Sequence, residues 1–199
     1  MRLLQGRRIE SAEKNELYEE KKSVTYKEQD ARKVAEYLDK IKDIPPDTIA
    51  YIDETGIDRY IYRQRAWSLR GAPVYGKVSG RKYRRTGIAA ALIRGVLAAP
   101  MQYDGTMDGE LFEAWFRDFL CPELSKGSTI IMDNASFHRK KKVENIANGF
   151  RHKVIFLPPY SPELNPIEHC RSALKRCMQG VMKYMPSFDS ALRYCIQVE

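Results

Sequence analysis

Two short stretches decide the fold. Residues 48–53 read Thr-Ile-Ala-Tyr-Ile-Asp, and residues 128–133 read Ser-Thr-Ile-Ile-Met-Asp. Each stretch is rich in β-branched and apolar residues and ends in an aspartate, which predicts a buried strand. Thr55-Gly56 predicts a turn after the first strand. Because catalytic groups collect in the crevice beyond strand ends, Asp53 and Asp133 are candidate site residues.

The sequence around these stretches predicts a mixed sheet covered by helices. Further strands are expected over residues 86–93, 95–99 and 153–157, and short strands or a hairpin arm over residues 57–85. Apolar residues recur every three or four positions in the segments 31–41, 111–120, 140–147, from Pro166 onward, and 188–198, where Ser187 is the expected cap. Neighbouring strands early in the chain can pair antiparallel, whereas helical crossovers imply parallel strands. The expected fold class is therefore α/β.

Composition sets the broad class of the protein. The 199 residues are 43% hydrophobic and 30% charged, which are ordinary globular values. The expected division is a charged N-terminal helical extension over residues 1–47, a sheet domain with the candidate site residues over residues 48–185 and a C-terminal helix over residues 186–199. No apolar run suits a membrane span and no signal-peptide core follows the N-terminus, so a cytoplasmic protein is expected.

The cysteines predict neither a zinc site nor disulfides. None of the four forms a C-x-x-C pair, and three histidines are the available partners. We therefore expect reduced, mostly buried thiols at Cys121, Cys170, Cys177 and Cys195.

The charge distribution predicts a polyanionic partner. The net charge is +8, and the segment 59–94, called the basic strip below, has ten lysines or arginines and no acid. The preceding segment, residues 47–58, has four acids and no base, which suggests a polyanion beside a cation-binding site. A solvated basic face is the alternative. The candidate contacts with DNA phosphates are Arg59, Arg63, Arg65, Arg70, Arg81, Lys82, Arg84 and Arg85 in the strip, and Lys140 and Lys141 after Asp133.

A third carboxylate, Glu168, follows the strand expected at residues 153–157. Residues 165–168 read Asn-Pro-Ile-Glu, which predicts a helix start with Asn165 as N-cap and Glu168 three residues later. Each acid taken alone has such a structural explanation. In a sheet of this order, however, Asp53, Asp133 and Glu168 can converge at one edge and offer the oxygen ligands that Mg²⁺ prefers. The lack of a glycine-rich phosphate loop argues against a nucleoside triphosphatase.

Three motifs together carry a family resemblance. They are Tyr-Ile-Asp-Glu-Thr-Gly at residues 51–56, Met-Asp-Asn-Ala-Ser-Phe-His at residues 132–138, and Leu-Pro-Pro-Tyr-Ser-Pro-Glu-Leu-Asn-Pro-Ile-Glu at residues 157–168. The chain resembles the catalytic domain of bacterial insertion-sequence transposases of the mariner superfamily over roughly residues 48–175. The 34 residues between Asp133 and Glu168 match the spacing typical of that branch.

The resemblance implies a ribonuclease-H-like fold and a DDE endonuclease site. It implies Asp53, Asp133 and Glu168 as catalytic ligands of two Mg²⁺ or Mn²⁺ ions, cleavage at element ends and strand transfer by the 3′-hydroxyl. Asn134 and His138 match the second motif and would orient the substrate or a metal ligand, although His138 could instead close a turn. The expected partners are transposon-end and target DNA and a second copy of the chain in a homodimer.

The chain departs from the family pattern in two places. The forty or so residues before the fold show no pair of DNA-reading helices, so a separate helix-turn-helix polypeptide or an upstream reading frame is expected, or the chain is a fragment. Cys170-Arg171 replaces the usual aromatic pair, and Arg171 could pair with Glu168 across one turn and weaken metal binding. The alternatives are a structure-specific endonuclease of the same fold without joining activity and an inactive, transposase-derived DNA-binding protein.

Overall fold

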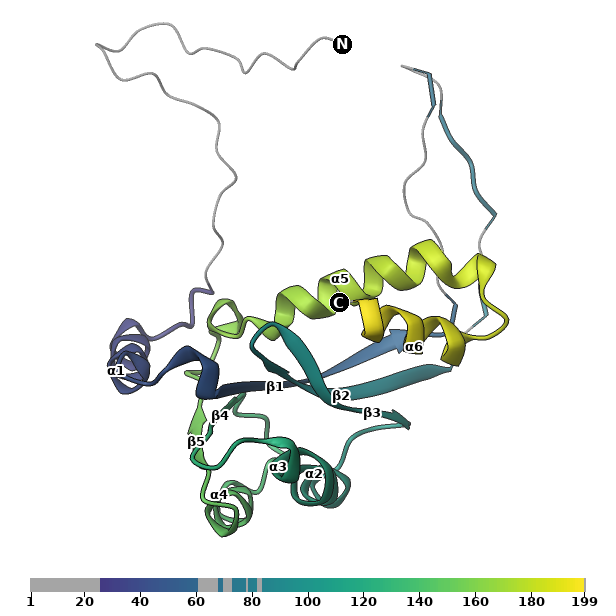
Figure 1. The fold of residues 1–199 in the computed structure, drawn as a ribbon. Helices are drawn as coiled ribbons and strands as arrows, with labels where there is room; N and C mark the ends of the chain where they lie inside the picture. Colours follow the sequence, from purple (N-terminus) through teal and green to yellow (C-terminus); the bar gives the residue numbers. More distant parts are fainter. Residues whose placement is uncertain (1–25, 61–67, 70–72, 78, 82–83, 199) are drawn as a thin grey trace, which may run out of the picture.

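The chain forms a mixed α/β fold around one sheet. The computed structural model describes residues 26–60, 68–69, 73–77, 79–81 and 84–198. Five strands lie in the order β3-β2-β1-β4-β5 (Figure 1). They are β1 (Ile49–Asp58), β2 (Arg85–Ile93), β3 (Val96–Asp104), β4 (Thr129–Met132) and β5 (Lys153–Phe156). The first three pair antiparallel, and β4 and β5 extend the sheet from β1 in parallel, which confirms the predicted mixed sheet.

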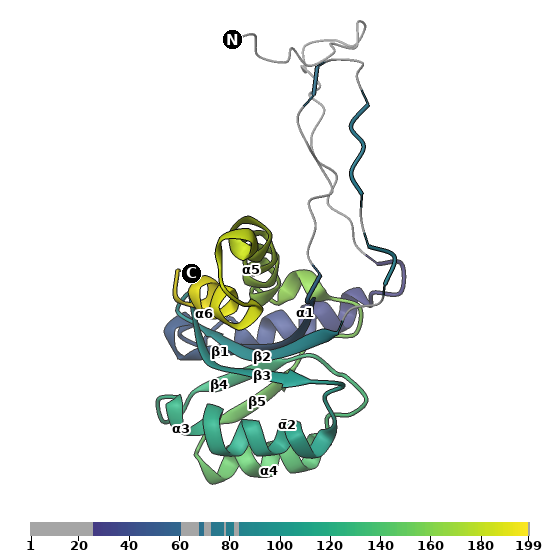
Figure 2. The same cartoon turned by 90° about the vertical axis from the view of Figure 1, so that its right-hand side faces the viewer.

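Helices cover both faces of the sheet (Figure 2). One face carries α2 (Gly109–Trp115), which continues through the π-helical turn η2 (Phe116–Leu120) into α3 (Cys121–Glu123), and α4 (Lys140–Gly149). The opposite face carries α1 (Ala31–Ile41), α5 (Ile167–Val181) and α6 (Phe188–Val198). Short 3-10 turns are η1 (Pro46–Thr48), η3 (Pro162–Leu164) and η4 (Met182–Tyr184). No helix in the described part of the chain combines the length and apolar character of a membrane span.

Side chains cap the N-termini of several of these helices. The carboxylate of Asp30 accepts hydrogen bonds from two backbone N–H groups of α1, and that of Asp108 does the same for α2. Ser187 accepts a hydrogen bond from the backbone N–H of Ser190 at 3.1 Å, which confirms it as the cap of α6. These bonds satisfy backbone donors that have no partner within the helix.

Alternation along β1 assigns its side chains to two different cores. Ala50 and Ile52 pack with Phe112 and Trp115 on the side of α2. Ile57 packs with residues of α5 and α6 on the other side. Successive side chains of a strand point to opposite faces, so the neighbours Asp53 and Glu54 leave β1 toward different sides of the sheet.

The structure corrects the expected strand ends. The residues Thr55 and Gly56 do not turn; they lie within β1 and pair with Ile88 and Gly87 of β2. Antiparallel pairing with β2 extends β1 to Asp58. Pairing with β2 also extends β3 to Asp104, beyond the expected strand end at residue 99. Cross-strand pairing over this length outweighs the local turn preference of the Thr-Gly pair.

The structure also corrects the expectation of four reduced thiols. A disulfide joins Cys177 of α5 to Cys195 of α6, with the Cα atoms 5.8 Å apart. Cys121 and Cys170 lie outside this disulfide. The pairing arises from the packing of α5 on α6, so the sequence spacing of 18 residues gave no motif to indicate it.

Candidate functional site

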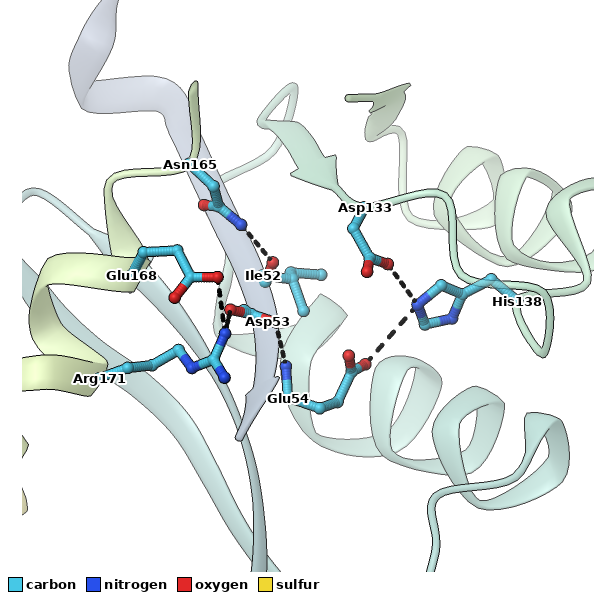
Figure 3. A network of polar contacts seen from close by, with 8 residues as sticks. All are labelled: Ile52, Asp53, Glu54, Asp133, His138, Asn165, Glu168 and Arg171. Carbon is cyan, nitrogen blue, oxygen red and sulfur yellow. Dashed lines mark hydrogen bonds and ion pairs between the residues drawn. The ribbon is translucent and has the colours of Figure 1, made fainter. Parts of the chain in front are cut away.

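The first two predicted acids flank the place where β1 and β4 separate. The parallel pairing of these strands ends with Tyr51 opposite Ile131. The same register, continued by two residues, sets Asp53 level with Asp133. From there β4 gives way to a loop, whereas β1 runs on beside β2. Figure 3 shows both side chains at this gap.

The third predicted acid reaches the gap from the first turn of α5. The loop before this helix is fastened to β1, because the side-chain amide of Asn165 donates a hydrogen bond to the carbonyl of Ile52 at 3.2 Å. The predicted capping arrangement is therefore wrong: α5 begins at Ile167 without a side-chain cap, and Asn165 is engaged with the strand instead. Glu168 is left free to face the gap.

Arg171 joins two of the three acids. Its Nη1 lies 2.5 Å from Asp53 Oδ2 and 2.7 Å from Glu168 Oε1. The side chains of Asp53 and Arg171 are 10% and 24% exposed, so this ion pair is largely removed from water. The pairing of Arg171 with Glu168 across one turn was predicted, whereas its contact with Asp53 was not. Charge-assisted hydrogen bonds of this kind keep the carboxylates of Asp53 and Glu168 close together.

His138 holds the remaining predicted acid. Asp133 Oδ1 accepts a hydrogen bond from the backbone N–H of Ala135 at 3.1 Å and lies 3.1 Å from His138 Nε2. The imidazole is 1% exposed and lies between the rings of Phe112 and Phe137, whose centroids are 4.3 and 4.1 Å away. The backbone N–H of His138 also closes the turn by bonding to the carbonyl of Ala135. Asn134, the other supporting candidate, is exposed.

Glu54 is a carboxylate of the site that was not predicted. Its Oε1 lies 3.8 Å from His138 Nε2, and this buried oxygen has no hydrogen-bond partner in the part of the chain that the structure describes. Glu54, Asp133 and His138 place one ligand atom each within 4.8 Å of one another. The available signal was the Asp53-Glu54 pair within the first motif, because a strand points such neighbours to both sides of the sheet.

Several carboxylates of the site are buried, and the nearby positive groups do not fully compensate for the cost of burying their negative charge. Burial raises the pKa of Glu54 to about 8, and the charges of Asp133 and Asp53 add to this. Burial also raises the pKa of Asp53 to about 6, assisted by Glu168 and opposed by Arg171. Burial would raise the pKa of Asp133 as well, but hydrogen bonds from His138 and the Ala135 N–H outweigh it and lower that pKa. A divalent cation would relieve this repulsion, so the oxygen donors fit such an ion.

The predicted DNA contacts are only partly placed. Arg63, Arg65, Arg70 and Lys82 lie outside the described residues. The positive charges of Arg59 and Arg84 are partly offset by Asp104, at 3.6 and 2.8 Å. Among the other described candidates, Arg81, Arg85, Lys140 and Lys141 are exposed, and Lys140 also lies 5.0 Å from the centroid of the Phe156 ring.

The strand order, the helices on both faces and the carboxylate cluster define an α/β protein of the ribonuclease-H-like class. Residues 48–190 match the family described as DDE superfamily endonuclease, and the chain belongs to this family. No curated protein matches the chain.

Solved structures show the same fold. The Mos1 mariner paired-end complex with Mn matches with a TM-score of 0.64 at 14% identity, over 92% of this chain and 63% of that chain. The Mos1 strand transfer complex matches with a TM-score of 0.62 at 13% identity, over 94% and 64%. A chain of the simian T-cell lymphotropic virus intasome, solved with PP2A regulatory subunit B56 gamma, matches at 0.53 and 14%, over 77% and 48%. These matches confirm the expected ribonuclease-H-like fold, and the chain spans under two thirds of the length of these relatives.

Proposed function

We propose that the chain is the catalytic domain of a transposase that cuts DNA at the ends of a mobile element and joins them to a target. The observation that carries this proposal is the convergence of Asp53, Asp133 and Glu168 from β1, the loop after β4 and the first turn of α5. The family match and the printed states of the Mos1 structures, a paired-end complex with Mn and a strand transfer complex, support it.

We propose Asp53, Asp133 and Glu168 as the ligands of two Mg²⁺ or Mn²⁺ ions. Two such ions activate the attacking oxygen and stabilise the leaving oxygen of a phosphodiester. The protein prepares the ligands: the Asn165 bond fixes the loop before Glu168 to β1, and the imidazole of His138 orients Asp133. The guanidinium of Arg171 has to leave the space between Asp53 and Glu168 before those two carboxylates can share an ion.

The basic strip is proposed to hold the DNA beside this site. The described candidates Arg59, Arg84 and Arg85 lie at the end of the β1–β2 pairing, where Asp58 is opposite Arg85, on the strand pair that also contains Asp53. Lysine and arginine neutralise DNA phosphates and release counterions, so binding through these side chains weakens steeply with salt. Lys140 and Lys141, at the start of α4, would contact the backbone from the side of Asp133.

The proposed assembly is a homodimer on paired DNA ends, with a separate helix-turn-helix polypeptide or an upstream reading frame to recognise the end sequence. The paired-end form of the Mos1 structures supports the dimer.

A second candidate function is DNA binding without catalysis. One observation favours it: Arg171 contacts two of the proposed metal ligands. A guanidinium in that place competes with the metal for the same oxygens, so a metal ion binds only at a concentration high enough to displace it.

A joining assay separates these functions. The reaction contains the full chain, Mn²⁺, a supercoiled target plasmid and a pre-cut duplex whose end sequence is taken from the DNA flanking the gene. If the chain is a transposase, we expect joined product with the wild type and none with Asp133→Asn. The control variant Asp118→Asn, which changes an exposed aspartate on η2, should still give joined product. Plasmid nicking without joining would indicate a structure-specific endonuclease. DNA binding with neither reaction would indicate the non-catalytic protein.

A further inference from the structure

A second group of possible metal ligands lies on the side of the gap opposite Arg171. There the carboxylates of Glu54 and Asp133 converge on the imidazole of His138 (Figure 3). The three residues come from β1, from the end of β4 and from the turn before α4, so the fold brings together groups far apart in the sequence. We propose that Glu54, Asp133 and His138 form a metal site of mixed nitrogen and oxygen ligands, and that it favours Mn²⁺ over Mg²⁺. The inference rests on the proposed function, because Asp133 belongs to both ligand sets.

The distances already approach those of a ligand set. His138 Nε2 lies 3.1 Å from Asp133 Oδ1 and 3.8 Å from Glu54 Oε1, and all three ligand atoms lie within 4.8 Å of one another. Ligand atoms about 2.0–2.2 Å from a common ion lie roughly 3–4 Å apart. Small side-chain rotations of Glu54 and Asp133 therefore suffice to bring the three atoms around one ion.

The burial of Glu54 and His138 points to a ligand. Oε1 of Glu54 is buried and lacks a hydrogen-bond partner among the described residues, which is costly for a carboxylate oxygen. The imidazole of His138 is 1% exposed, and the rings of Phe112 and Phe137 fix its plane with Nε2 toward the two carboxylates. Asp133, at 50% exposed, leaves an entry path from solvent.

The imidazole nitrogen determines which metal the site would select. Mg²⁺ prefers oxygen ligands, whereas imidazole suits softer first-row ions, among which Mn²⁺ accepts both ligand types. Nε2 donates its hydrogen to Asp133 in the metal-free protein, because a carboxylate can only accept. To bind a metal through Nε2, the neutral ring carries its hydrogen on Nδ1 instead. Nδ1 is buried and has no hydrogen-bond partner among the described residues, so the bond between the metal and Nε2 has to offset an unsatisfied donor.

Electron spin echo measurements on bound Mn²⁺ test the proposal directly. The full chain, stripped of metal with a chelator, is loaded with less than one equivalent of Mn²⁺. We expect modulation from a directly bound ¹⁴N nucleus, which changes to the ¹⁵N pattern when the protein is labelled with ¹⁵N-histidine. The signal should disappear in His138→Gln and remain in His169→Gln, because His169 is exposed and adjoins the other proposed ligand, Glu168. The wild-type measurement needs no variant to fold, and the absence of nitrogen modulation would overturn the proposal.

Calorimetry supplies the second readout. Glu54→Gln should raise the Kd for Mn²⁺ at least tenfold, whereas Glu123→Gln, which removes a carboxylate bound to the backbone of Ala99, should leave it unchanged. The preference for Mn²⁺ over Mg²⁺ should fall in His138→Gln. If Asp133→Asn abolishes Mn²⁺ binding while Glu54→Gln and His138→Gln bind as wild type does, this inference is wrong and the acidic triad stands. If the wild-type chain binds no Mn²⁺, the triad proposal is wrong as well.

Discussion

The guanidinium of Arg171 lies 2.5 Å from the carboxylate of Asp53, on a different element and 118 residues away in the sequence. The same nitrogen lies 2.7 Å from Glu168. One side chain therefore supplies positive charge at the point where two proposed metal ligands meet. This arrangement stabilises the metal-free cluster and opposes the entry of a metal ion, and the first prediction separates these two effects.

Replacing Arg171 should change stability and metal affinity in opposite directions. Arg171→Gln removes the charge between Asp53 and Glu168, so the metal-free chain should lose about 1–3 kcal/mol of unfolding free energy. The same change should lower the Kd for Mn²⁺ about tenfold or more, because the ion no longer displaces a guanidinium. Thermal unfolding in a chelator and calorimetry with Mn²⁺ measure the two effects. Arg176→Gln, exposed on the same helix, is the control. Unchanged Mn²⁺ affinity in Arg171→Gln would show that Arg171 does not compete with the metal.

The stability of the metal-free chain should fall as pH rises toward 8. The pKa of Glu54 is about 8 in the folded protein and lies near its ordinary 4.5 when unfolded. Between these values the folded state holds a proton that the unfolded state releases, so unfolding becomes easier with each unit of pH. Asp53, with a folded pKa of about 6, contributes in the same direction up to that pH. Chemical unfolding at pH 5 to 8.5 measures the trend.

A variant shows which carboxyl group causes this pH dependence. Glu54→Gln should flatten the profile between pH 5 and 8, because the amide does not titrate. Glu110→Gln, whose side chain is 87% exposed, should keep the wild-type profile. A profile in Glu54→Gln as steep as that of the wild type would assign the effect to another group.

Reduction of the Cys177–Cys195 disulfide should destabilise the packing of α6 on α5. A cross-link that closes a loop of this size stabilises a protein by about 3 kcal/mol in the chain-entropy model. We therefore expect a lower Tm in dithiothreitol, and the same Tm in Cys195→Ser with or without the reductant. Cys170→Ser should behave as wild type, because Cys170 lies outside the disulfide. Mass spectrometry of the unreduced chain, showing four free thiols, would contradict the pairing.

DNA binding should depend steeply on salt through the basic strip. Replacing Arg81, Lys82, Arg84 and Arg85 by alanine should reduce the slope of log K against log salt by up to about 0.9 for each phosphate contact removed. Fluorescence anisotropy with a labelled duplex at several salt concentrations measures this slope. The matched control replaces four exposed lysines elsewhere: Lys33, Lys40, Lys42 and Lys126. An equal change of slope in both variants would place the DNA on no particular face.

Much of the fold could be predicted because its signals are local and repeated. Apolar periodicity located the strands and helices, and the parallel register then fixed Asp53 beside Asp133. Long-range pairing explains the errors. The partner strand β2 carried β1 through the expected turn at Gly56, and the carbonyl of Ile52 engaged the side chain of Asn165 that was expected to cap α5.

The acidic residues of the candidate site could be predicted from the sequence, whereas the residues that contact them could be predicted only in part. Asp53, Asp133 and Glu168 stand in motifs that the sequence displays. The pairing of Arg171 with Glu168 follows from helical spacing, but its contact with Asp53 depends on how α5 lies against β1. Glu54 belongs to the site because β1 points it toward His138, a relationship that only the packed sheet reveals.

Asp53, Asp133 and Glu168 are proposed as the metal ligands of this DDE endonuclease domain. Calorimetric titration of Mn²⁺ into the metal-free chain tests this claim, with Asp53→Asn, Asp133→Asn and Glu168→Gln beside the wild type and Asp118→Asn as the control. We predict that wild type and Asp118→Asn bind Mn²⁺ and that each of the three site variants binds it at least tenfold more weakly. Equal binding by wild type and Asp133→Asn would contradict the claim.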